Sequence, residues 1–152
     1  METLNRNTRQ MHVSVAFRES MPLRGTNRAG HTTLFDTSPE FYGTGSAPSP
    51  IEMVLQSLAA CSMMDVISIL KKKRRDVVSL TAEVDADRAE EHPKVFTAIR
   101  VQYRLESPDC PLSDLQRAVS LSIEKYCSVS AMLRQSGCGI EWEAELVREA
   151  RQ

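Results

Sequence analysis

Two cysteines are the residues of this chain best placed to do chemistry. Cys61 and Cys127 each lie among apolar neighbours in a strong helical pattern, one over 49–74 and the other over 115–135. No histidine stands at metal-ligand spacing from either thiol. A pair of core thiols without a metal partner indicates redox chemistry, provided that the two sulfurs meet.

The reactivity of Cys61 depends on a cation from elsewhere in the chain. A cysteine reacts as its thiolate, and its pKa falls beside a positive charge or at a helix N-terminus. Cys61 follows Pro50 by eleven residues, about three helical turns, so the helix dipole contributes little. The candidate cations lie on and around the first strand: Arg18, Arg24 and Arg28. Without one of them Cys61 is an inert core thiol, and both interpretations stay open.

Cys127 is expected to face the core from the middle of its helix. Helical steps place four residues on one stripe: Leu115, Val119, Ile123 and Cys127. The hydroxyl groups of Tyr126 and Ser130 would suit a small polar pocket beside the thiol, although core packing alone also explains the stripe. The other two cysteines, Cys110 and Cys138, are expected to be peripheral and without a role.

The composition indicates one globular domain in the cytoplasm. The chain has 152 residues, a net charge of −1 and 5% aromatic residues. Nucleic-acid partners usually require a basic excess and stacking aromatics, so none is expected. The first twelve residues lack the apolar stretch of a signal peptide, which predicts a cytoplasmic protein with reduced thiols.

The periodicity predicts an α+β fold with an antiparallel sheet and two main helices. Alternating apolar residues predict strands over 11–17, 31–36, 77–87, 95–105 and 140–147. Loops are expected over 24–30 and 37–50. The prediction is a single domain over 10–148, between a flexible N-terminus (1–9) and a tail (149–152).

The first helix is expected to begin at Ser49 and Pro50, with Glu52 in its first turn. It ends at the basic run 71–75, which suits a solvated helix C-terminus. The second helix is expected to run without a break from about 111 to 135.

The apolar segment 51–70 could be mistaken for a membrane span. Polar side chains interrupt it, and Asp65 near the centre of a bilayer would be costly. A helix that is apolar on most sides must be covered by protein on most sides. A homodimer that encloses this helix is therefore expected, and no membrane.

Both cysteine segments resemble one known family. The segment 48–73, with the stretch Ala59–Cys61 at its centre, resembles the first cysteine helix of the osmotically inducible protein C and organic hydroperoxide resistance family. Residues 124–130 resemble the second cysteine motif of that family, and the order of elements agrees from about residue 10 to 148. Within the family, the segments are most similar to a poorly characterised branch.

The resemblance implies intertwined homodimers with buried cysteine helices and a thiol-dependent peroxidase. Cys61 would reduce an organic hydroperoxide and become a sulfenic acid, Cys127 would close a disulfide, and an external dithiol would reduce it, without metal or cofactor. The resemblance also implies an arginine that activates Cys61, with Arg24 and Arg28 as candidates, and a glutamate that orients it. Glu52 stands one residue later than that glutamate, which turns a helical side chain by about 100°.

Two other classes of function stay open. One is a non-enzymatic redox sensor, or a protein that binds a small apolar ligand, on the same scaffold. The other is a metal site formed by Cys61, Cys127 and His31, which no CxxC or HxxxH spacing supports.

Overall fold

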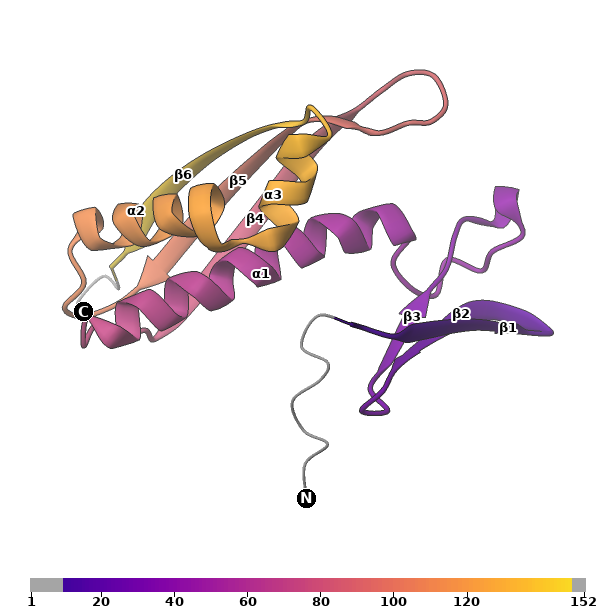
Figure 1. Ribbon diagram of the computed structural model, residues 1–152, viewed down its shortest axis with the longest axis horizontal. Helices are drawn as coiled ribbons and strands as arrows, with labels where there is room; N and C mark the ends of the chain where they lie inside the picture. The colour runs from indigo at the N-terminus through magenta and orange to yellow at the C-terminus, as the bar shows by residue number, and fades with distance from the viewer. Residues whose placement is uncertain (1–9, 149–152) are drawn as a thin grey trace. The chain divides into compact units, whose positions relative to one another are not determined.

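The computed structural model of the chain describes residues 10–148, so the expected flexible N-terminus (1–9) and the tail (149–152) lie outside the described residues. Its contacts divide the chain into two units, one ending at Met53 and the other beginning at Val54. Each unit carries a three-stranded sheet (Figure 1). The fold is α+β, as the sequence predicts, with three α-helices among the described residues instead of the expected two.

The sheet of the first unit is an antiparallel meander. Its strands are β1 (Val13–Arg18), β2 (Ser20–Asn27) and β3 (Thr32–Phe35), paired in the order β1-β2-β3. The expected loop over 24–30 is wrong for its first half, because β2 continues to Asn27. The chain turns only after that strand, where Gly30 takes a φ of +85°.

Pro22 and Gly25 make β2 difficult to predict from the sequence, since both residues weaken a strand pattern. Pro22 lies beyond Leu23, the last β2 residue paired with β3, and beside the irregularity in the β1–β2 pairing. A proline at such a place removes no hydrogen bond from the ladder. Gly25 lies against Phe35, whose ring carbon would be 3.2 Å from an added Cβ.

A buried aspartate organises the connection to the first helix. Asp36 accepts hydrogen bonds from the hydroxyl groups of Thr44 and Ser46, each at 2.6 Å, and from three backbone N–H groups. The hydroxyls of Ser46 and Thr44 hold the pKa of the Asp36 carboxyl well below its usual range. The connection is otherwise irregular, as expected, apart from the single turn η1 (Pro39–Phe41).

The first long helix, α1 (Pro50–Lys72), begins and ends where the sequence predicts. The Ser49 hydroxyl accepts from the Glu52 N–H at 3.3 Å, and the Glu52 carboxylate accepts from the Ser49 N–H at 2.8 Å. This is a capping box, which satisfies donors that a helix start leaves free. Lys71 and Lys72 lie in the last turn, at the negative end of the helix dipole.

The second unit has a mixed sheet, in the order β4-β5-β6. The antiparallel hairpin of β4 (Ser79–Arg88) and β5 (Phe96–Glu106) confirms the two predicted strands. The expectation of a purely antiparallel sheet is wrong for β6 (Gly139–Val147), which runs parallel to β5. Two parallel neighbours need a long crossover, and the helical segment between residues 107 and 138 provides it.

That crossover is where the expected continuous second helix is wrong. It consists of α2 (Leu112–Leu121), a π-helical turn η2 (Ser122–Tyr126) and α3 (Ser128–Gln135). The Cys127 N–H bonds to the Ser122 carbonyl at 2.7 Å, five residues back. The backbone of Cys127 itself is extended, with φ −73° and ψ 108°, so α3 begins as a separate helix after it.

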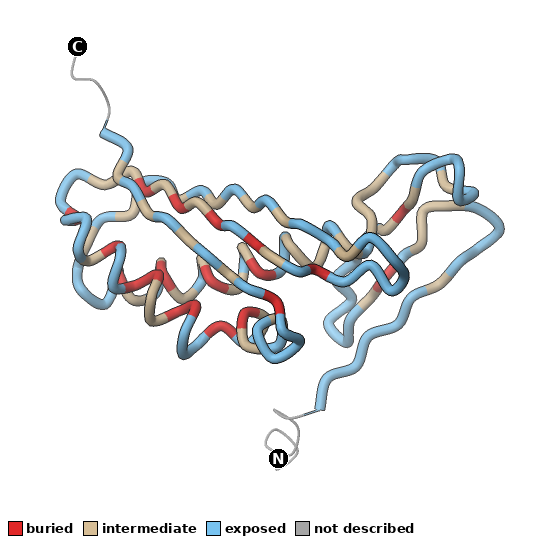
Figure 2. The backbone as a smooth tube through the Cα atoms, turned by 90° about the horizontal axis from the view of Figure 1, so that it is seen from above, coloured by how far each residue is buried: buried red, intermediate tan, exposed pale blue. Residues whose placement is uncertain are grey.

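The core of the second unit lies between its helices and one face of its sheet (Figure 2). β5 contributes alternate buried side chains, as a strand with one covered face should. The helices contribute the buried side chains that pack against this face of the sheet. The fully buried members with large side chains include Tyr103, Leu105, Leu58, Leu70 and Leu115.

Candidate active site

Cys61 lies beside the buried stripe of α1. That stripe repeats every four residues and consists of Leu58, Ser62, Val66 and Leu70. Cys61 immediately precedes Ser62, so its side chain lies at the edge of the stripe and is half-buried. It is in the middle of a continuous helix, as the sequence predicts.

Cys127 does not lie in mid-helix as expected, because it is the N-cap residue of α3. Its sulfur accepts a hydrogen bond from the Ser130 N–H at 3.3 Å. All four members of the expected stripe are buried, so the prediction that Cys127 faces the core is confirmed. The helix break places Cys127 at the start of α3, and its thiol remains buried.

The two thiols are neighbours, and both are free. Burial, together with a smaller contribution from the adjacent Cys61 thiol, raises the pKa of the Cys127 thiol to about 11. The Ser130 N–H opposes this shift without cancelling it, since an N–H donor at a helix start stabilises a thiolate. Cys127 is therefore a thiol that keeps its proton at neutral pH beside a more accessible partner.

A buried hydroxyl pair lies next to Cys61. The Ser62 and Tyr103 hydroxyl oxygens are 2.6 Å apart, and the Ser62 hydroxyl donates to the Ala59 carbonyl at 3.0 Å. Both side chains are fully buried. Burial raises the pKa of the Tyr103 phenol to about 12, the Ser62 hydrogen bond lowers it, and charge on Cys127 would raise it. Tyr103 is thus a neutral hydrogen-bonding group close to the thiol pair.

A second buried serine links the two cysteine segments. The Ser122 hydroxyl donates to the Asp65 carboxylate at 2.7 Å and approaches the Ser62 carbonyl at 3.3 Å. Ser122 opens the π-helical turn that ends at Cys127. The hydrogen bonds of Ser122 therefore connect the turn of α1 that follows Cys61 to the π-helical turn that precedes Cys127.

The irregular turn itself is held by side chains of α3. The Ile123 carbonyl accepts from the Ser130 hydroxyl at 2.8 Å and from the Arg134 guanidinium at 2.7 Å. Arg134 also donates to the Glu124 carbonyl at 3.3 Å. A π-helical turn leaves carbonyls without their usual helical donors, and these side chains replace those donors.

Glu52 is engaged at the start of α1. Its carboxylate accepts from both the N–H and the hydroxyl of Ser49, each at 2.8 Å. These hydrogen bonds hold the pKa of the Glu52 carboxyl below its usual value, the backbone donor having the larger effect. The capping box gives this residue a structural role at the start of α1.

The candidate arginines belong to the first unit, and the thiols belong to the second. Arg18 and Arg24 line one surface hollow of about 250 Å³ on the β1–β2 hairpin, whereas Arg28 follows the end of β2. Their roles, and the role of Glu52 toward them, stay predictions.

Cys110 and Cys138 are buried, so the expectation that they are peripheral is wrong in that respect. Burial raises the pKa of both thiols, which makes each of them a weak nucleophile. For the metal alternative, the described residues contain no group of three or more His, Cys, Asp or Glu side chains that could hold an ion. His31 instead lies 3.1 Å from the side-chain nitrogen of Asn27.

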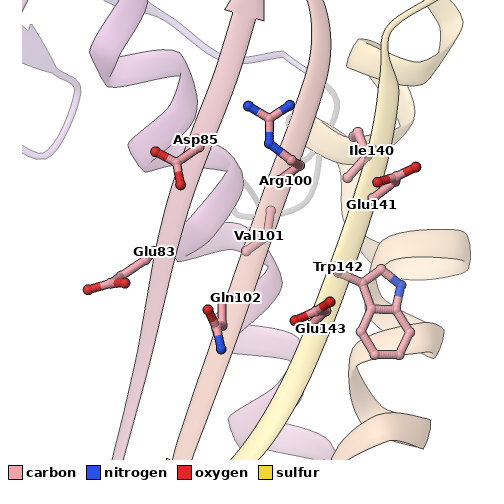
Figure 3. Close-up of a pocket in the computed structure, with 9 residues that line it drawn as sticks. All are labelled: Glu83, Asp85, Arg100, Val101, Gln102, Ile140, Glu141, Trp142 and Glu143. Carbon is pink, nitrogen blue, oxygen red and sulfur yellow. The ribbon is translucent and has the colours of Figure 1, made fainter.

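The opposite face of the second sheet is polar and acidic. It carries an open hollow of about 590 Å³, around which Glu83, Asp85, Arg100, Gln102 and Glu143 project from three strands (Figure 3). No cysteine lines this hollow. Cys61 and Cys127 therefore lie away from this hollow, on the helix-covered side of the sheet.

Sequence reasoning missed Ser62, Asp65, Tyr103, Ser122 and Arg134 as site residues. A signal existed for two of them. Ser62 stands four residues after Leu58 and four before Val66, and Ser122 stands three residues after Val119. A serine on an otherwise apolar stripe has to find a buried hydrogen-bond partner.

Comparison with known proteins agrees with this fold. The model of the OsmC-like protein family matches residues 43–143. The protein YhfA of Escherichia coli K12 is 39% identical over 126 residues, covering 83% of this chain and 91% of YhfA. A hypothetical protein from Aquifex aeolicus has a crystal structure with 30% identity and a TM-score of 0.75, covering 91% of this chain and 98% of that one.

More distant structures share the fold. The organic hydroperoxide resistance protein OsmC of Legionella pneumophila is 12% identical with a TM-score of 0.63, covering 94% of this chain and all of that one (100%). Identity at that level shows the fold alone. The family match and the identity to YhfA show that the chain belongs to the OsmC-like protein family.

Proposed function

We propose that the protein is a thiol-dependent peroxidase that reduces organic hydroperoxides in the cytoplasm. The observation that carries the proposal is the pairing of a half-buried Cys61 with a buried, proton-retaining Cys127. Such an asymmetric pair suits two successive roles, one sulfur that meets the substrate and one that resolves the product. The peroxide-related names belong to distant structural relatives, and the activity is carried to this chain as a proposal.

The first step would occur at Cys61. Its thiolate attacks the outer oxygen of the hydroperoxide, the O–O bond breaks, and the alkoxide leaves and takes up a proton as the alcohol. The sulfur is oxidised to a sulfenic acid. The attacking residue is Cys61, because a Cys127 thiol with a pKa of about 11 is almost fully protonated at neutral pH.

The second step would use Cys127. Its sulfur attacks the Cys61 sulfur, the S–O bond breaks, and the Cys127 proton leaves with the hydroxyl oxygen as water. The product is a Cys61–Cys127 disulfide, which an external dithiol reduces. Arg18, Arg24 or Arg28 would supply the cation that activates Cys61.

We also propose that the working form is a homodimer. Apart from its buried stripe, the apolar side chains of α1 are mostly only half-buried, and Met64 is 70% exposed. By length and composition α1 could cross a membrane, but Asp65 lies in its middle and bonds to Ser122. A second copy over this face would cover it. The wild type should have the molar mass of two chains in solution and Met64→Asp that of one, and a wild-type mass of one chain would contradict the dimer.

The test of the peroxidase is consumption of cumene hydroperoxide by the reduced protein in the presence of dithiothreitol. Wild type should turn over, Cys61→Ser should be inactive, and Cys127→Ser should stop after one equivalent or over-oxidise. Cys138→Ala is the matched control and should keep its activity. Consumption no faster than that of free thiols would refute the proposal.

The engagement of Glu52 favours a second candidate function. A carboxylate already bonded to Ser49 has less capacity to orient an arginine. The same scaffold would then be a redox sensor or a binding protein for a small apolar ligand. Stabilisation by such a ligand without peroxide consumption would support this second function.

A further inference from the structure

We propose that Ser122 is a positioning residue that holds Cys127 against Cys61 for disulfide formation. This inference rests on the proposed two-cysteine reaction and names a residue that the cysteine motifs do not include. The Ser122 hydroxyl bonds to Asp65 and Ser62, and its carbonyl bonds to the backbone of Cys127. Ser122 would therefore act through the backbone on which Cys127 stands.

Ser122 carries two connections at once. Its hydroxyl reaches α1, at the Asp65 carboxylate (2.7 Å) and the Ser62 carbonyl (3.3 Å). Its carbonyl accepts the N–H of Cys127 at 2.7 Å. One residue therefore ties the backbone of Cys127 to the helix turn that carries Cys61.

This connection is local to the thiols and is buried at Ser122 and Ser62 and partly buried at Asp65. Ser62 follows Cys61 directly, Asp65 is one turn further on, and Ser122 has no exposed surface. Among the described residues, Ser122 makes the side-chain hydrogen bonds between α1 and the π-helical turn. A hydrogen bond to a carboxylate is stronger than one between neutral groups, so it should fix the distance between the two segments.

The π-helical turn makes such a connection necessary. An extended Cys127 interrupts the helix, and a regular helix would have set the position of the thiol by its own ladder. With the ladder broken, side chains must replace it. Ser130 and Arg134 hold the turn on the α3 side, whereas Ser122 holds it against α1.

A matched control exists at the other end of the same helix pair. Asp114 of α2 accepts from Lys73 at 2.8 Å and from Arg75 at 2.9 Å, just beyond α1. Asp114→Ala thus removes a side-chain connection between α2 and the end of α1 that lies away from Cys61 and Cys127. Ser122→Thr keeps the hydroxyl, and Asp65→Ala removes its main acceptor.

The first readout needs no peroxide. The Cys61–Cys127 disulfide is equilibrated with reduced and oxidised dithiothreitol, quenched and measured by peptide mapping. Ser122→Ala should lower the equilibrium constant for disulfide formation about tenfold or more, because misplaced thiols have a lower effective concentration. Asp65→Ala should give a smaller loss, and Ser122→Thr and Asp114→Ala should remain within about twofold to threefold.

The second readout separates the two steps of the proposed reaction. With one equivalent of cumene hydroperoxide, Ser122→Ala should form the Cys61 sulfenic acid at the wild-type rate but close the disulfide at least about tenfold more slowly. A sulfenate-trapping dione measures the first step, and peptide mapping measures the second.

The outcomes distinguish failure of the two proposals. If Ser122→Ala and Asp65→Ala match Asp114→Ala in the dithiothreitol equilibrium, Ser122 has no positioning role. If wild type ignores peroxide while Ser122→Ala still weakens the disulfide, the peroxidase proposal fails and the positioning role stands. Should Ser122→Ala not fold, Asp65→Ala alone decides, and an unchanged equilibrium there overturns the inference.

Discussion

The two cysteine segments reach the same site by opposite means. Cys61 stands on the unbroken helix α1, which packing holds in place through a buried stripe of four residues. Cys127 stands at a break between η2 and α3, which hydrogen bonds from Ser122, Ser130 and Arg134 hold in place. One segment is regular and apolar, and the other is irregular and polar.

This difference suits different chemical tasks. A regular helix keeps Cys61 fixed at the edge of the core, where the half-buried sulfur would be accessible to the proposed hydroperoxide. The break gives Cys127 the N-cap position of α3, although burial outweighs that effect and leaves its pKa at about 11. The comparison teaches that a helix N-terminus does not by itself make a reactive thiolate.

The largest expected effect is the pH dependence of the Cys127 thiol. In a Cys61→Ser variant, burial should still hold the pKa of the Cys127 thiol well above that of an ordinary thiol, so very little Cys127 should be ionised at pH 7. Its alkylation by iodoacetamide, followed by mass spectrometry, should rise about tenfold per pH unit from pH 7 to 9.5. A plateau near pH 9 would show that Cys127 is an ordinary thiol, which would contradict the difference described here between the two cysteines.

The same pKa shift predicts how stability depends on pH. The folded thiol holds its proton more tightly than the unfolded one, whose pKa is about 8.5. Its contribution to the free energy of unfolding is complete below about pH 8.5 and is lost as pH rises toward 11. Cys127→Ala should flatten this alkaline decline.

A large effect on stability is expected from packing on the Cys61 side. Leu58 is fully buried one turn before Cys61, so Leu58→Ala should reduce the free energy of unfolding by about 2–5 kcal/mol. Urea unfolding at a fixed protein concentration measures it. The exposed neighbour Ser57 provides the control, since Ser57→Ala should change stability by less than about 0.5 kcal/mol. Equal effects would show that packing does not hold this segment.

A smaller effect is expected from one hydrogen bond on the Cys127 side. Ser130→Ala removes the hydroxyl donor of the Ile123 carbonyl, while Arg134 continues to donate to it. The loss should be about 1 kcal/mol, with faster alkylation of Cys127 as the turn loosens. Ser128→Ala alters an exposed serine of the same helix and should change neither quantity. Identical behaviour of the two variants would exclude Ser130 as a support of the turn.

The smallest expected effect concerns the start of α1. Ser49→Ala should cost about 1 kcal/mol or less of stability, and it should leave the reactivity of Cys61 unchanged because the cap is about three turns away. The Glu52 carboxylate has a lowered pKa, so its contribution is present above about pH 4 and is lost as pH falls further. The melting temperatures of Glu52→Ala and wild type should therefore become equal in acid. Slower oxidation of Cys61 in either variant would instead give Glu52 a part in the chemistry.

The sequence predicts those elements whose signals are local. Ser49 and Pro50 mark the start of α1, and clean alternation marks the β4–β5 hairpin. The parallel direction of β6 could not be read from its own residues, because an alternating pattern fits either direction. β2 was missed because Pro22 and Gly25 are tolerated there only through the pairing of its neighbours.

The site could be predicted in part for the same reason. The stripe through Cys127 indicates a core thiol, and the structure confirms its burial. The break before it could not be predicted, since Ser122–Tyr126 contains no proline or glycine and is stabilised by contacts from Arg134 and from α1. Tyr103 enters the site from a strand far away in sequence, and only the packed fold brings it to Ser62.

The most direct test of the account is peptide mapping after one equivalent of cumene hydroperoxide has reacted with the fully reduced protein. The account predicts a single new disulfide, between Cys61 and Cys127, with Cys110 and Cys138 still reduced. Oxidation that leaves Cys61 and Cys127 as free thiols, or a disulfide that includes Cys110 or Cys138, would contradict it.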